Sequence, residues 1–423
     1  MSVECLPAYN DECKTAYDIT ERRIVMKNNS AASFWLVGYL LTLLMVGTNL
    51  PSPLYGVYQH DWGFSSGILT LVFAVYALMI IPSSLLFGQL SDRFGRKKIL
   101  VPGFVVAALG SALFASANDV AWLFIARAIQ GLAVGIVSGP ATAALAELHP
   151  RGDRRQAALI ASVATASGSA LGPILAGILA QYGPWPTVFP FIIHLILLIP
   201  GVLALLFIPE TVHGRSEGRW RPQKPGVPSE IRPPFVIGSA AAFIAWAVTA
   251  LFMSLVPSYV GALLHIQNLA IAGGVVFVML GSSSMVQLSL KRLAVRVCLI
   301  TGLILLIIGL AGVVLAVPVQ SAILLVMSTI ITGAGQGLAF MGSMTLIGQV
   351  APPQRRGDVI SSFYVVIYCG VGIPILGVGF GAETFGLYHA VLAFACAVGI
   401  LGVLLAVLIS AKRNLIPTAS QAQ

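Results

Sequence analysis

Long apolar runs separated by short polar segments make up most of this chain. We count twelve runs, at about residues 34–56, 67–87, 99–117, 120–147, 156–181, 186–208, 235–261, 267–289, 297–316, 320–347, 358–381 and 387–410. A helix that crosses the hydrocarbon core of a bilayer needs roughly 20 mostly apolar residues. In lipid the backbone of such a run must satisfy its own hydrogen bonds, so each run is predicted to be a transmembrane helix.

The basic residues test this count, because they occur in every second polar segment. They lie before the first run, after each even-numbered run, and almost nowhere else; Arg127 is the single exception among the 24 Lys and Arg residues. The positive-inside rule makes the basic side cytoplasmic. Both termini are therefore expected in the cytoplasm, and omission of one run would destroy the alternation.

The composition of the 423 residues excludes an ordinary soluble enzyme. The chain is 57% hydrophobic and 9% charged, with a mean hydropathy of +0.92, whereas globular domains are about 25% charged. Topology and attraction to anionic lipid headgroups account for the net charge of +9, so no nucleic-acid partner is expected. We predict an all-α membrane protein with twelve transmembrane helices.

Neither a leader peptide nor a metal site is expected. The first run is too long for a signal peptide, follows a polar tail and lacks a small-residue cleavage site. The five cysteines are scattered, and no pair has the spacing of metal ligands. The sequence therefore predicts no metal and no cofactor.

The second half of the chain repeats the first. Gln130-Gly-Leu-Ala returns as Gln336-Gly-Leu-Ala, and Pro173-Ile-Leu-Ala returns as Pro374-Ile-Leu-Gly. A repeat of six runs predicts two pseudo-symmetric six-helix bundles with a binding site between them near the membrane midplane. The expected organisation is a cytoplasmic tail at 1–33, a bundle at 34–211, a Pro- and Gly-rich linker at 212–234, a second bundle at 235–411 and a tail at 412–423.

The segment between the second and third runs is the most informative motif. It reads Gly88-Gln-Leu-Ser-Asp-Arg-Phe-Gly-Arg-Lys-Lys-Ile-Leu100, and its charges predict a tight turn that faces water. This segment resembles the signature loop of the major facilitator superfamily of secondary transporters. The resemblance covers about residues 34–411 and implies a carrier, expected to be a monomer, that moves a small solute by alternating access. Its partners would be that solute, membrane lipids and protons.

In the family this loop is a cytoplasmic latch, and five residues match it. The resemblance assigns the latch to Gly88, Asp92, Arg93, Gly95 and Arg96. The carboxylate would face the positive N-terminal end of the eleventh helix, where a negative charge gains about 0.3–1 kcal/mol. The alternative is a solvated turn without a gating role.

Arg127 is the only cation within a run. An arginine at the centre of a membrane helix costs about 2.5–3.5 kcal/mol on insertion scales, so it is expected to face a cavity or a partner. The surrounding Phe124-Ile-Ala-Arg-Ala-Ile-Gln-Gly131 resembles the family's fourth-span motif, in which the arginine borders the central cavity. The alternative is an arginine that binds neighbouring carbonyl groups and holds helices together.

The fifth run contains small residues at intervals of four or five positions. Gly168, Gly172, Pro173 and Gly177 resemble the motif of export-type antiporters, including drug/proton antiporters. The match is incomplete, because Leu159 stands where an early glycine is expected. Small residues also allow close helix packing in general, which is the alternative interpretation.

The substrate cavity is expected to carry one positive charge and several aromatic or amide groups. Candidates for its wall are Asn49, Arg127, Gln130, Trp246, Gln336 and Tyr364. A lone buried cation favours neutral or anionic amphiphilic solutes over cations. No Asp or Glu lies deep in any run, so the proton carrier is open between Glu147, Asp61 and His194, the last of which is expected to be packed and neutral.

Four other functions are alternatives to an exporter. A membrane enzyme would need paired carboxylates, a histidine pair or a Ser/Lys dyad within the runs, and a nucleotide-driven pump would need a phosphate-binding Gly-rich loop. Neither pattern is present. An uptake carrier for a metabolite or organic anion, and a membrane scaffold or receptor without transport activity, remain as alternatives.

Overall fold

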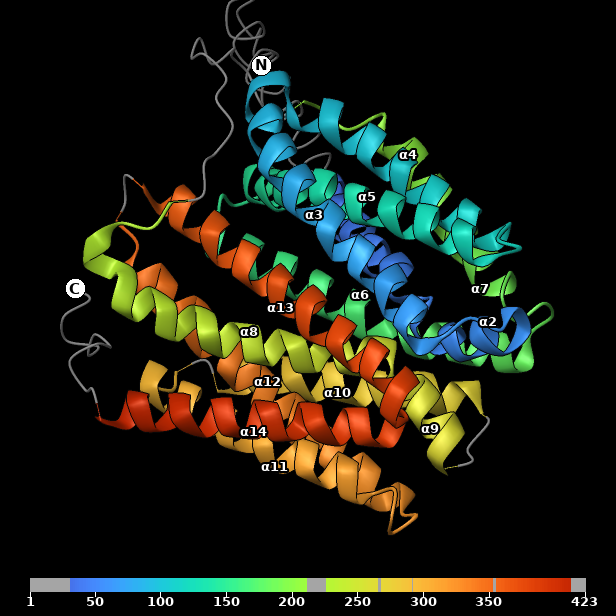
Figure 1. Ribbon diagram of the computed structural model, residues 1–423. Coiled ribbons are helices and arrows are strands. Elements are labelled where there is room, and N and C mark those ends of the chain that lie inside the picture. Colours follow the sequence, from blue (N-terminus) through green and yellow to red (C-terminus); the bar gives the residue numbers. More distant parts are fainter. Residues whose placement is uncertain (1–30, 211–225, 265–267, 291, 353–354, 412–423) are drawn as a thin grey trace, which may run out of the picture.

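The computed structural model describes residues 31–210, 226–264, 268–290, 292–352 and 355–411 (Figure 1). Within these ranges the chain forms helices and turns only. The helices are residues 31–49, η1 (Ser52–Leu54), α2 (Tyr55–Trp62), α3 (Ser66–Phe94), α4 (Arg96–Ala115), α5 (Val120–Leu148), α6 (Arg154–Tyr182), α7 (Phe189–Leu205), η2 (Ser229–Ile231), α8 (Arg232–Ser254), α9 (Val256–Leu264), α10 (Leu269–Ser289), α11 (Val295–Leu315), α12 (Ala322–Val350), α13 (Arg356–Phe385) and α14 (Leu387–Ala411).

The predicted all-α membrane fold is confirmed. Eleven helical segments of the described chain are long and apolar enough to span a bilayer, the first of them Ala31–Trp62. The remaining predicted run, the sixth at 186–208, corresponds to α7, which has 17 residues and is shorter than the others. At 1.5 Å per residue α7 extends about 25 Å, slightly less than a typical hydrocarbon core.

Polar residues fix the starts of several helices. The carboxylate of Asp119 accepts hydrogen bonds from the backbone N–H groups of Ala121 and Trp122 at the start of α5. Asp153 caps α6 in the same way, and its bonds from the N–H groups of Gln156 and Arg155 hold its pKa below the usual range. Such caps satisfy the free N–H groups of a first helical turn. The helix boundaries therefore follow from the polar residues between the apolar runs.

The predicted water-facing turn at 88–100 is much shorter than expected. Helix α3 continues to Phe94 and α4 begins at Arg96, so Gly95 alone joins the two helices. Gly95 has a φ of +105°, a conformation that L side chains rarely adopt. The rest of the signature segment is helical, because its charged residues occupy helix ends that extend beyond the apolar runs.

The helices form two like halves. Residues 31–62 pack with α3 to α7, and α8 to α14 form the second half; α3–α5 and α10–α12 are corresponding close pairs. Glycines at equivalent places allow these crossings: a Cβ on Gly131 would collide with the carbonyl oxygen of Tyr76, and one on Gly337 would lie 2.5 Å from that of Ser283. Between the halves, α3 lies against α13 and α6 lies against α10.

The two ends of the molecule differ in charge. The basic end is the one that carries the turns around Arg96, Arg154, Arg296 and Arg356, and the opposite end carries α2 and α9. In Figure 1 the halves draw together near α2 and α9 and spread apart toward the basic end. Regular structure begins at Ser229, within the predicted linker 212–234; residues 211–225 and both predicted tails up to residue 30 and from 412 lie outside the described residues.

Candidate functional site

Prolines near the end of the first helix leave backbone carbonyl groups free. The carbonyl of Gly47 would normally accept a hydrogen bond from the residue four positions later, but that residue is Pro51, which has no N–H. Regular helix stops at residue 49, and the chain continues as η1 and α2. Mid-membrane acceptors are thereby exposed to the neighbouring helix α5.

Arg127 and Gln130 of α5 bind these acceptors. The amide nitrogen of Gln130 donates to the carbonyl oxygen of Gly47 at 3.0 Å. Arg127 Nη1 donates to the carbonyl oxygen of Thr48 at 2.8 Å and to Gln130 Oε1 at 3.0 Å. The two residues are one helical turn apart, so they form a single polar cluster that joins α5 to residues 47 and 48.

Aromatic rings enclose the guanidinium group. Its central carbon lies 4.8 Å from the ring centre of Tyr76, 5.2 Å from that of Phe73 and 5.7 Å from that of Tyr55. Arg127 is only 2% exposed. Among the described residues no acidic group forms an ion pair with it, and its Nε atom has no hydrogen-bond partner. The site thus holds a buried cation that rings and carbonyl groups stabilise only in part.

The sequence did not identify these three rings. Tyr76, Phe73 and Tyr55 lie within apolar runs, where aromatic residues are common and carry no signal of their own. The sequence contains one hint: Phe73 and Tyr76 are three residues apart, so they share one face of α3. Only the folded structure places this face of α3 beside Arg127.

The other predicted cavity residues are distributed over several contacts. Buried Asn49 donates to the carbonyl oxygen of Met45 at 2.7 Å and packs against α6, since a Cβ on Gly172 would lie 2.9 Å from Asn49 Cβ. Buried Gln336 accepts a hydrogen bond from Ser283 of α10. Gln130 and Gln336 are thus equivalent in sequence but bind different elements: Gln130 binds the first helix and Gln336 binds α10.

Aromatic residues of the second half lie on α8, α12 and α13. Trp246 of α8 and Phe340 of α12 meet edge to face at 5.6 Å. Tyr364 is 38% exposed and stacks on Tyr368 at 6.3 Å. Tyr368 packs against hydrophobic clusters of both halves. The structure therefore brings Arg127, Gln130 and Asn49 near one another, and places Trp246, Gln336 and Tyr364 in the other half; whether any of them binds substrate stays a prediction.

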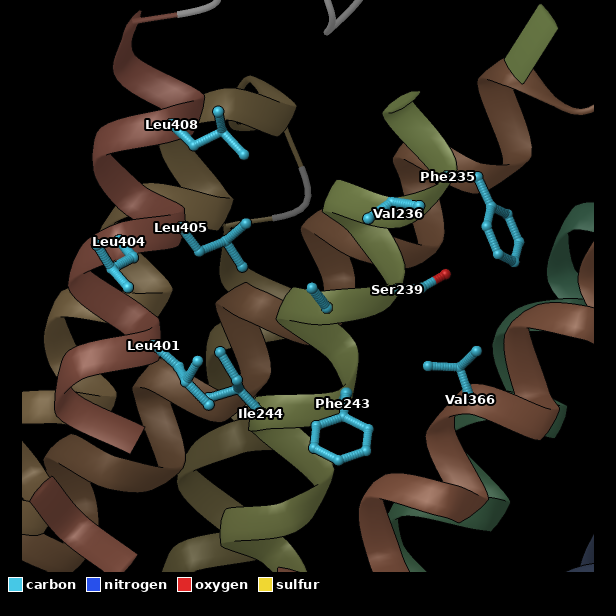
Figure 2. A pocket seen from close by; sticks show the side chains of 11 residues that line it. Phe235, Val236, Ser239, Phe243, Ile244, Val366, Leu401, Leu404, Leu405 and Leu408 are labelled. Atoms are coloured by element: carbon cyan, nitrogen blue, oxygen red, sulfur yellow. The ribbon is translucent and has the colours of Figure 1, made fainter. Parts of the chain in front are cut away.

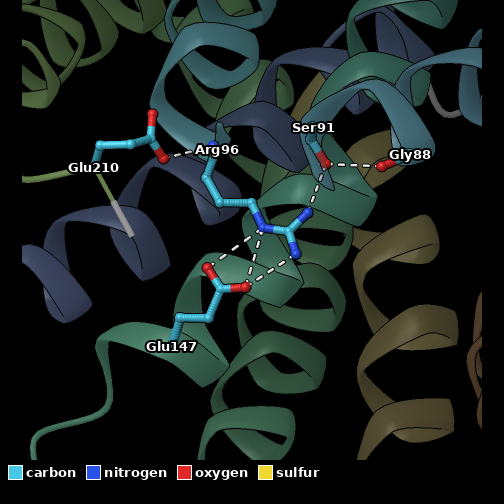
Figure 3. A network of polar contacts seen from close by, with 5 residues as sticks. All are labelled: Gly88, Ser91, Arg96, Glu147 and Glu210. Carbon is cyan, nitrogen blue, oxygen red and sulfur yellow. Dashed lines mark hydrogen bonds and ion pairs between the residues drawn. The ribbon is translucent and has the colours of Figure 1, made fainter. Parts of the chain in front are cut away.

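Arg96 is the centre of a polar network at the basic end (Figure 3). Its guanidinium donates to both carboxylate oxygens of Glu147 at 2.9–3.3 Å and to Ser91 Oγ at 2.7 Å. Its backbone N–H donates to Glu210 Oε1 at 2.7 Å. Glu210 also lies so close to Gly95 that a Cβ there would collide with the carboxylate. The network joins α3, α4, α5 and the segment after α7 within the first half.

The remaining predicted latch residues are arranged differently. Arg93 is exposed, with its guanidinium carbon 5.8 Å from the ring centre of Phe94. The carbonyl of Gly88 accepts a hydrogen bond from Ser91 Oγ, and a Cβ on Gly88 would meet nothing within 4 Å. The side chain of Asp92 lies outside the described part of the structure. The latch role of these residues stays a prediction.

The glycines of the fifth run allow close helix contacts. A Cβ on Gly168 would collide with the carbonyl oxygen of Thr42, and one on Gly172 would lie 2.7 Å from that of Val46, so both permit α6 to lie against the first helix. A Cβ on Gly177 would collide with the carbonyl oxygen of Leu269, and the carbonyl of Pro173 occupies the space beside Gly273. The motif therefore supports packing both within the first half and between the halves.

Hydrogen bonds between the halves gather at the opposite end. In the described ranges four side chains make them: Ser52 donates to the carbonyl of Met253, Ser258 donates to Gln59, Gln181 accepts from the N–H of Leu269, and Glu383 accepts from the N–H of Gly67 at 3.0 Å. Gly67 is in the first turn of α3, so the Glu383 carboxylate also faces the positive end of that helix. The structure is closed at this end.

Glu383 is expected to hold the two halves together. Replacement by glutamine keeps an oxygen acceptor for Gly67 but removes the negative charge at the α3 N-terminus, which is worth about 0.3–1 kcal/mol, or a two- to fivefold change in an equilibrium. We expect E383Q to increase the population open at this end by about that factor. Spin labels at Asn118→Cys and Phe385→Cys, both exposed, measure the change by pulsed electron resonance after replacement of the five native cysteines.

Asp61 provides the matched control for this experiment. It lies at the same end but pairs with His60 of its own half at 3.1 Å. Asp61→Asn should leave the distance distribution unchanged. An unaltered distribution in E383Q would show that the Glu383 contact is incidental.

Comparisons with known proteins identify the family. The sequence profile of the Major Facilitator Superfamily matches residues 36–375 and 289–422. The chain belongs to this superfamily, as the signature segment and the half-chain repeat predict.

Individual relatives match only part of the chain. An uncharacterized transporter of Buchnera aphidicola is 34% identical over 35% of this chain and 37% of its own length. The riboflavin transporter RibZ of Clostridioides difficile is 26% identical over 36% of this chain and 33% of its own length. The quinolone resistance protein NorA of Staphylococcus aureus is 29% identical over 33% of this chain and 36% of its own length. The alignments thus span about a third of these relatives.

Solved structures share the fold over nearly the whole chain. A bacterial homolog of the human lysosomal transporter Spinster, in an inward-facing and unoccupied conformation, has a TM-score of 0.75 at 15% identity, covering 92% of this chain and 99% of that one. The nucleoside transporter NupG has a TM-score of 0.72 at 15% identity, covering 91% and 99%. At this identity the likeness establishes the fold and not the substrate.

Proposed function

We propose that the protein is a secondary active transporter that exports a small amphiphilic compound, neutral or anionic, by alternating access and in exchange for protons. The observation that carries this proposal is the one-sided contact between the halves. The hydrogen bonds described between them lie at the opposite end, including the one from Gly67 to Glu383. Two pseudo-symmetric halves whose described hydrogen bonds lie at one end can exchange these bonds for contacts at the other end.

The direction of opening follows from the charge distribution. If the basic end is cytoplasmic, as the positive-inside rule requires, the structure is closed toward the outside. Closure of the cytoplasmic side would then bring α13 toward Gly88, where space for a neighbour is free. Asp92 would meet the N-terminal end of α13, which begins at Arg356. The latch and the Glu383 contact would thus form in turn, each in one conformation of the transport cycle.

Arg127 supports an anionic or neutral substrate. Its charge has no acidic partner among the described residues, and its Nε donor is free. An approaching anion would be stabilised, while a cation would be repelled. The rings of Tyr76 and, across the interface, Tyr368 and Tyr364 offer flat apolar surfaces for an aromatic solute. Relatives named for quinolone resistance and for riboflavin transport support a small organic compound.

Proton coupling would use groups at the ends of the helices. Glu147 is bound to Arg96 at the basic end, and Asp61 pairs with His60 at the opposite end. His194 is buried, accepts or donates at 2.9 Å with Ser111, and contacts the carbonyl of Leu43 at 2.9 Å. Because that carbonyl can only accept, Nε2 carries a proton, and Ser111 can satisfy Nδ1 of a neutral ring. This arrangement supports a packed neutral histidine. Glu147 and Asp61 are therefore better candidates than His194 for the group that carries the proton.

Membrane vesicles test the proposed function. Inverted vesicles from cells that overproduce the protein, energised by respiration, should accumulate an anionic aromatic dye such as a carboxyfluorescein, and a protonophore should abolish the accumulation. A dicationic dye of similar size should not accumulate above vesicles without the protein. Strong transport of the dication would contradict the assignment of substrate charge to Arg127.

An uptake carrier is the second candidate, favoured by the partial likeness to a riboflavin transporter. It predicts accumulation in right-side-out vesicles and none in inverted ones. A scaffold or receptor predicts no flux in either orientation. The two vesicle preparations therefore distinguish all three functions.

A further inference from the structure

A groove on the membrane-facing side of the second half is separate from the region around Arg127. It lies between α8, α13 and α14 near the basic end and has a volume of about 510 Å³ (Figure 2). Its wall consists almost entirely of apolar side chains, among them Phe235, Phe243, Val366, Leu401 and Leu405. In a membrane protein such a groove is filled by hydrocarbon rather than by water.

Sequence and packing explain where the groove ends. A Cβ on Gly370 of α13 would lie 2.8 Å from the carbonyl oxygen of Phe243, so α8 and α13 touch there. From Phe235 to Ile244 the lining extends about 13 Å along α8, close to the roughly 15 Å of one leaflet's hydrocarbon. The groove therefore spans a single leaflet and is closed at the membrane midplane.

One polar group interrupts the apolar wall. Ser239 is 4% exposed, lines the groove, and its hydroxyl has no hydrogen-bond partner in the described structure. Figure 2 shows this hydroxyl directed away from α8 beside Phe235, on the side where Val366 of α13 lies. A buried hydroxyl without a partner is unfavourable, so a ligand that accepts a hydrogen bond there would be stabilised.

Basic residues lie at the mouth of the groove. Arg232, exposed at the start of α8, is one turn from Val236 on the same helix face. Arg296 donates to the carbonyl of Ser410, two residues beyond the lining residue Leu408. Two acids lie nearby: Glu230 interacts with Arg355 and Arg232, and Asp358 pairs with Arg355 at 3.5 Å. Together with Arg296 the three cations outnumber these two acids.

We propose that this groove binds one phospholipid with an anionic headgroup from the leaflet at the basic end. Arg232 and Ser239 are two helical turns apart, about 10 Å along α8. A phospholipid has the same order of groups: a phosphate at the surface, ester carbonyls beneath it, and acyl chains below. The phosphate would pair with Arg232, an ester carbonyl would accept from Ser239, and one acyl chain would fill the groove toward Phe243.

Native mass spectrometry of the purified full-length protein tests this proposal. The protein is equilibrated with equal amounts of phosphatidylglycerol and phosphatidylcholine. The lipid molecules that stay bound to the protein after mild collisional activation are then counted. Wild type should retain one phosphatidylglycerol. Ala240→Phe should lose it, because Ala240 lines the groove and the larger side chain would occupy it. Ala311→Phe, an equal enlargement at an exposed position on α11, should retain it.

Two milder substitutions test the hydroxyl contact and the phosphate contact one at a time. Neither introduces a larger side chain that the protein would have to accommodate. Ser239→Ala should reduce retention about fivefold, the effect of losing one ordinary hydrogen bond. Arg232→Gln should make retention of the two lipids equal. Equal retention by wild type and all three groove variants would overturn the proposal, and so would an equal loss in Ala311→Phe, which would indicate unspecific annular lipid.

Discussion

Replacing Arg127 by methionine should lower the rate of dye transport in inverted vesicles by about ten- to a hundredfold. The substitution keeps a long apolar stem but removes the bonds to Thr48 and Gln130 and the only charge of the site. A hydrogen bond from a charged group contributes about 1.5–3 kcal/mol, and 1.4 kcal/mol corresponds to a factor of ten. Initial rates normalised to the amount of protein in the membrane measure the effect.

Two further variants make this result specific to the site. Arg127→Lys keeps the charge but not the planar fork, so an intermediate rate is expected. Arg151→Gln removes a cation from an exposed position at the basic end and should transport at the wild-type rate. Full activity of Arg127→Met would mean that the arginine only holds α5 to the first helix.

The substitution Gly177→Ala is expected to disfavour closure of the opposite end. The added Cβ would collide with the backbone of Leu269, which cannot move away as a flexible side chain can. Overpacking of this kind costs about 1–3 kcal/mol, so the closed population should fall about five- to a hundredfold. Labels at Asn118→Cys and Phe385→Cys should therefore report a longer distance between the halves.

The control for this variant is Gly139→Ala. Gly139 lies within α5, and a Cβ there would meet nothing within 4 Å. Its distance distribution should match that of the wild type. A closed population in Gly177→Ala equal to that of the control would show that α6 and α10 can separate locally without opening the end.

The apolar runs predicted the helices well because lipid leaves the backbone few alternatives. The run at 120–147 became α5 at Val120–Leu148, and the run at 387–410 became α14 at Leu387–Ala411. Predictions failed where charged residues extend a helix beyond the hydrocarbon. The signature segment looked like a loop, yet α3 and α4 continue through it and leave only Gly95 as a junction.

The site was less predictable than the fold. The cost of a buried cation pointed correctly to Arg127 as an unusual residue, but charge and spacing do not reveal its partners. These are the carbonyls of Gly47 and Thr48, bound through Gln130 and Arg127, and three rings from other helices. Backbone carbonyl groups leave no pattern in the amino-acid sequence. The one exception is Pro51, which lies four positions after Gly47 and frees its carbonyl.

The location of these acceptors has a consequence for how the chain enters the bilayer during synthesis. Helix α5 alone would carry an uncompensated guanidinium into hydrocarbon, at a cost of about 2.5–3.5 kcal/mol. Thr48 precedes Arg127 by 79 positions, so it emerges from the ribosome before the arginine does. The carbonyl of Thr48 is therefore in the membrane before the arginine that binds it, and so is the carbonyl of Gly47, which Pro51 frees for Gln130.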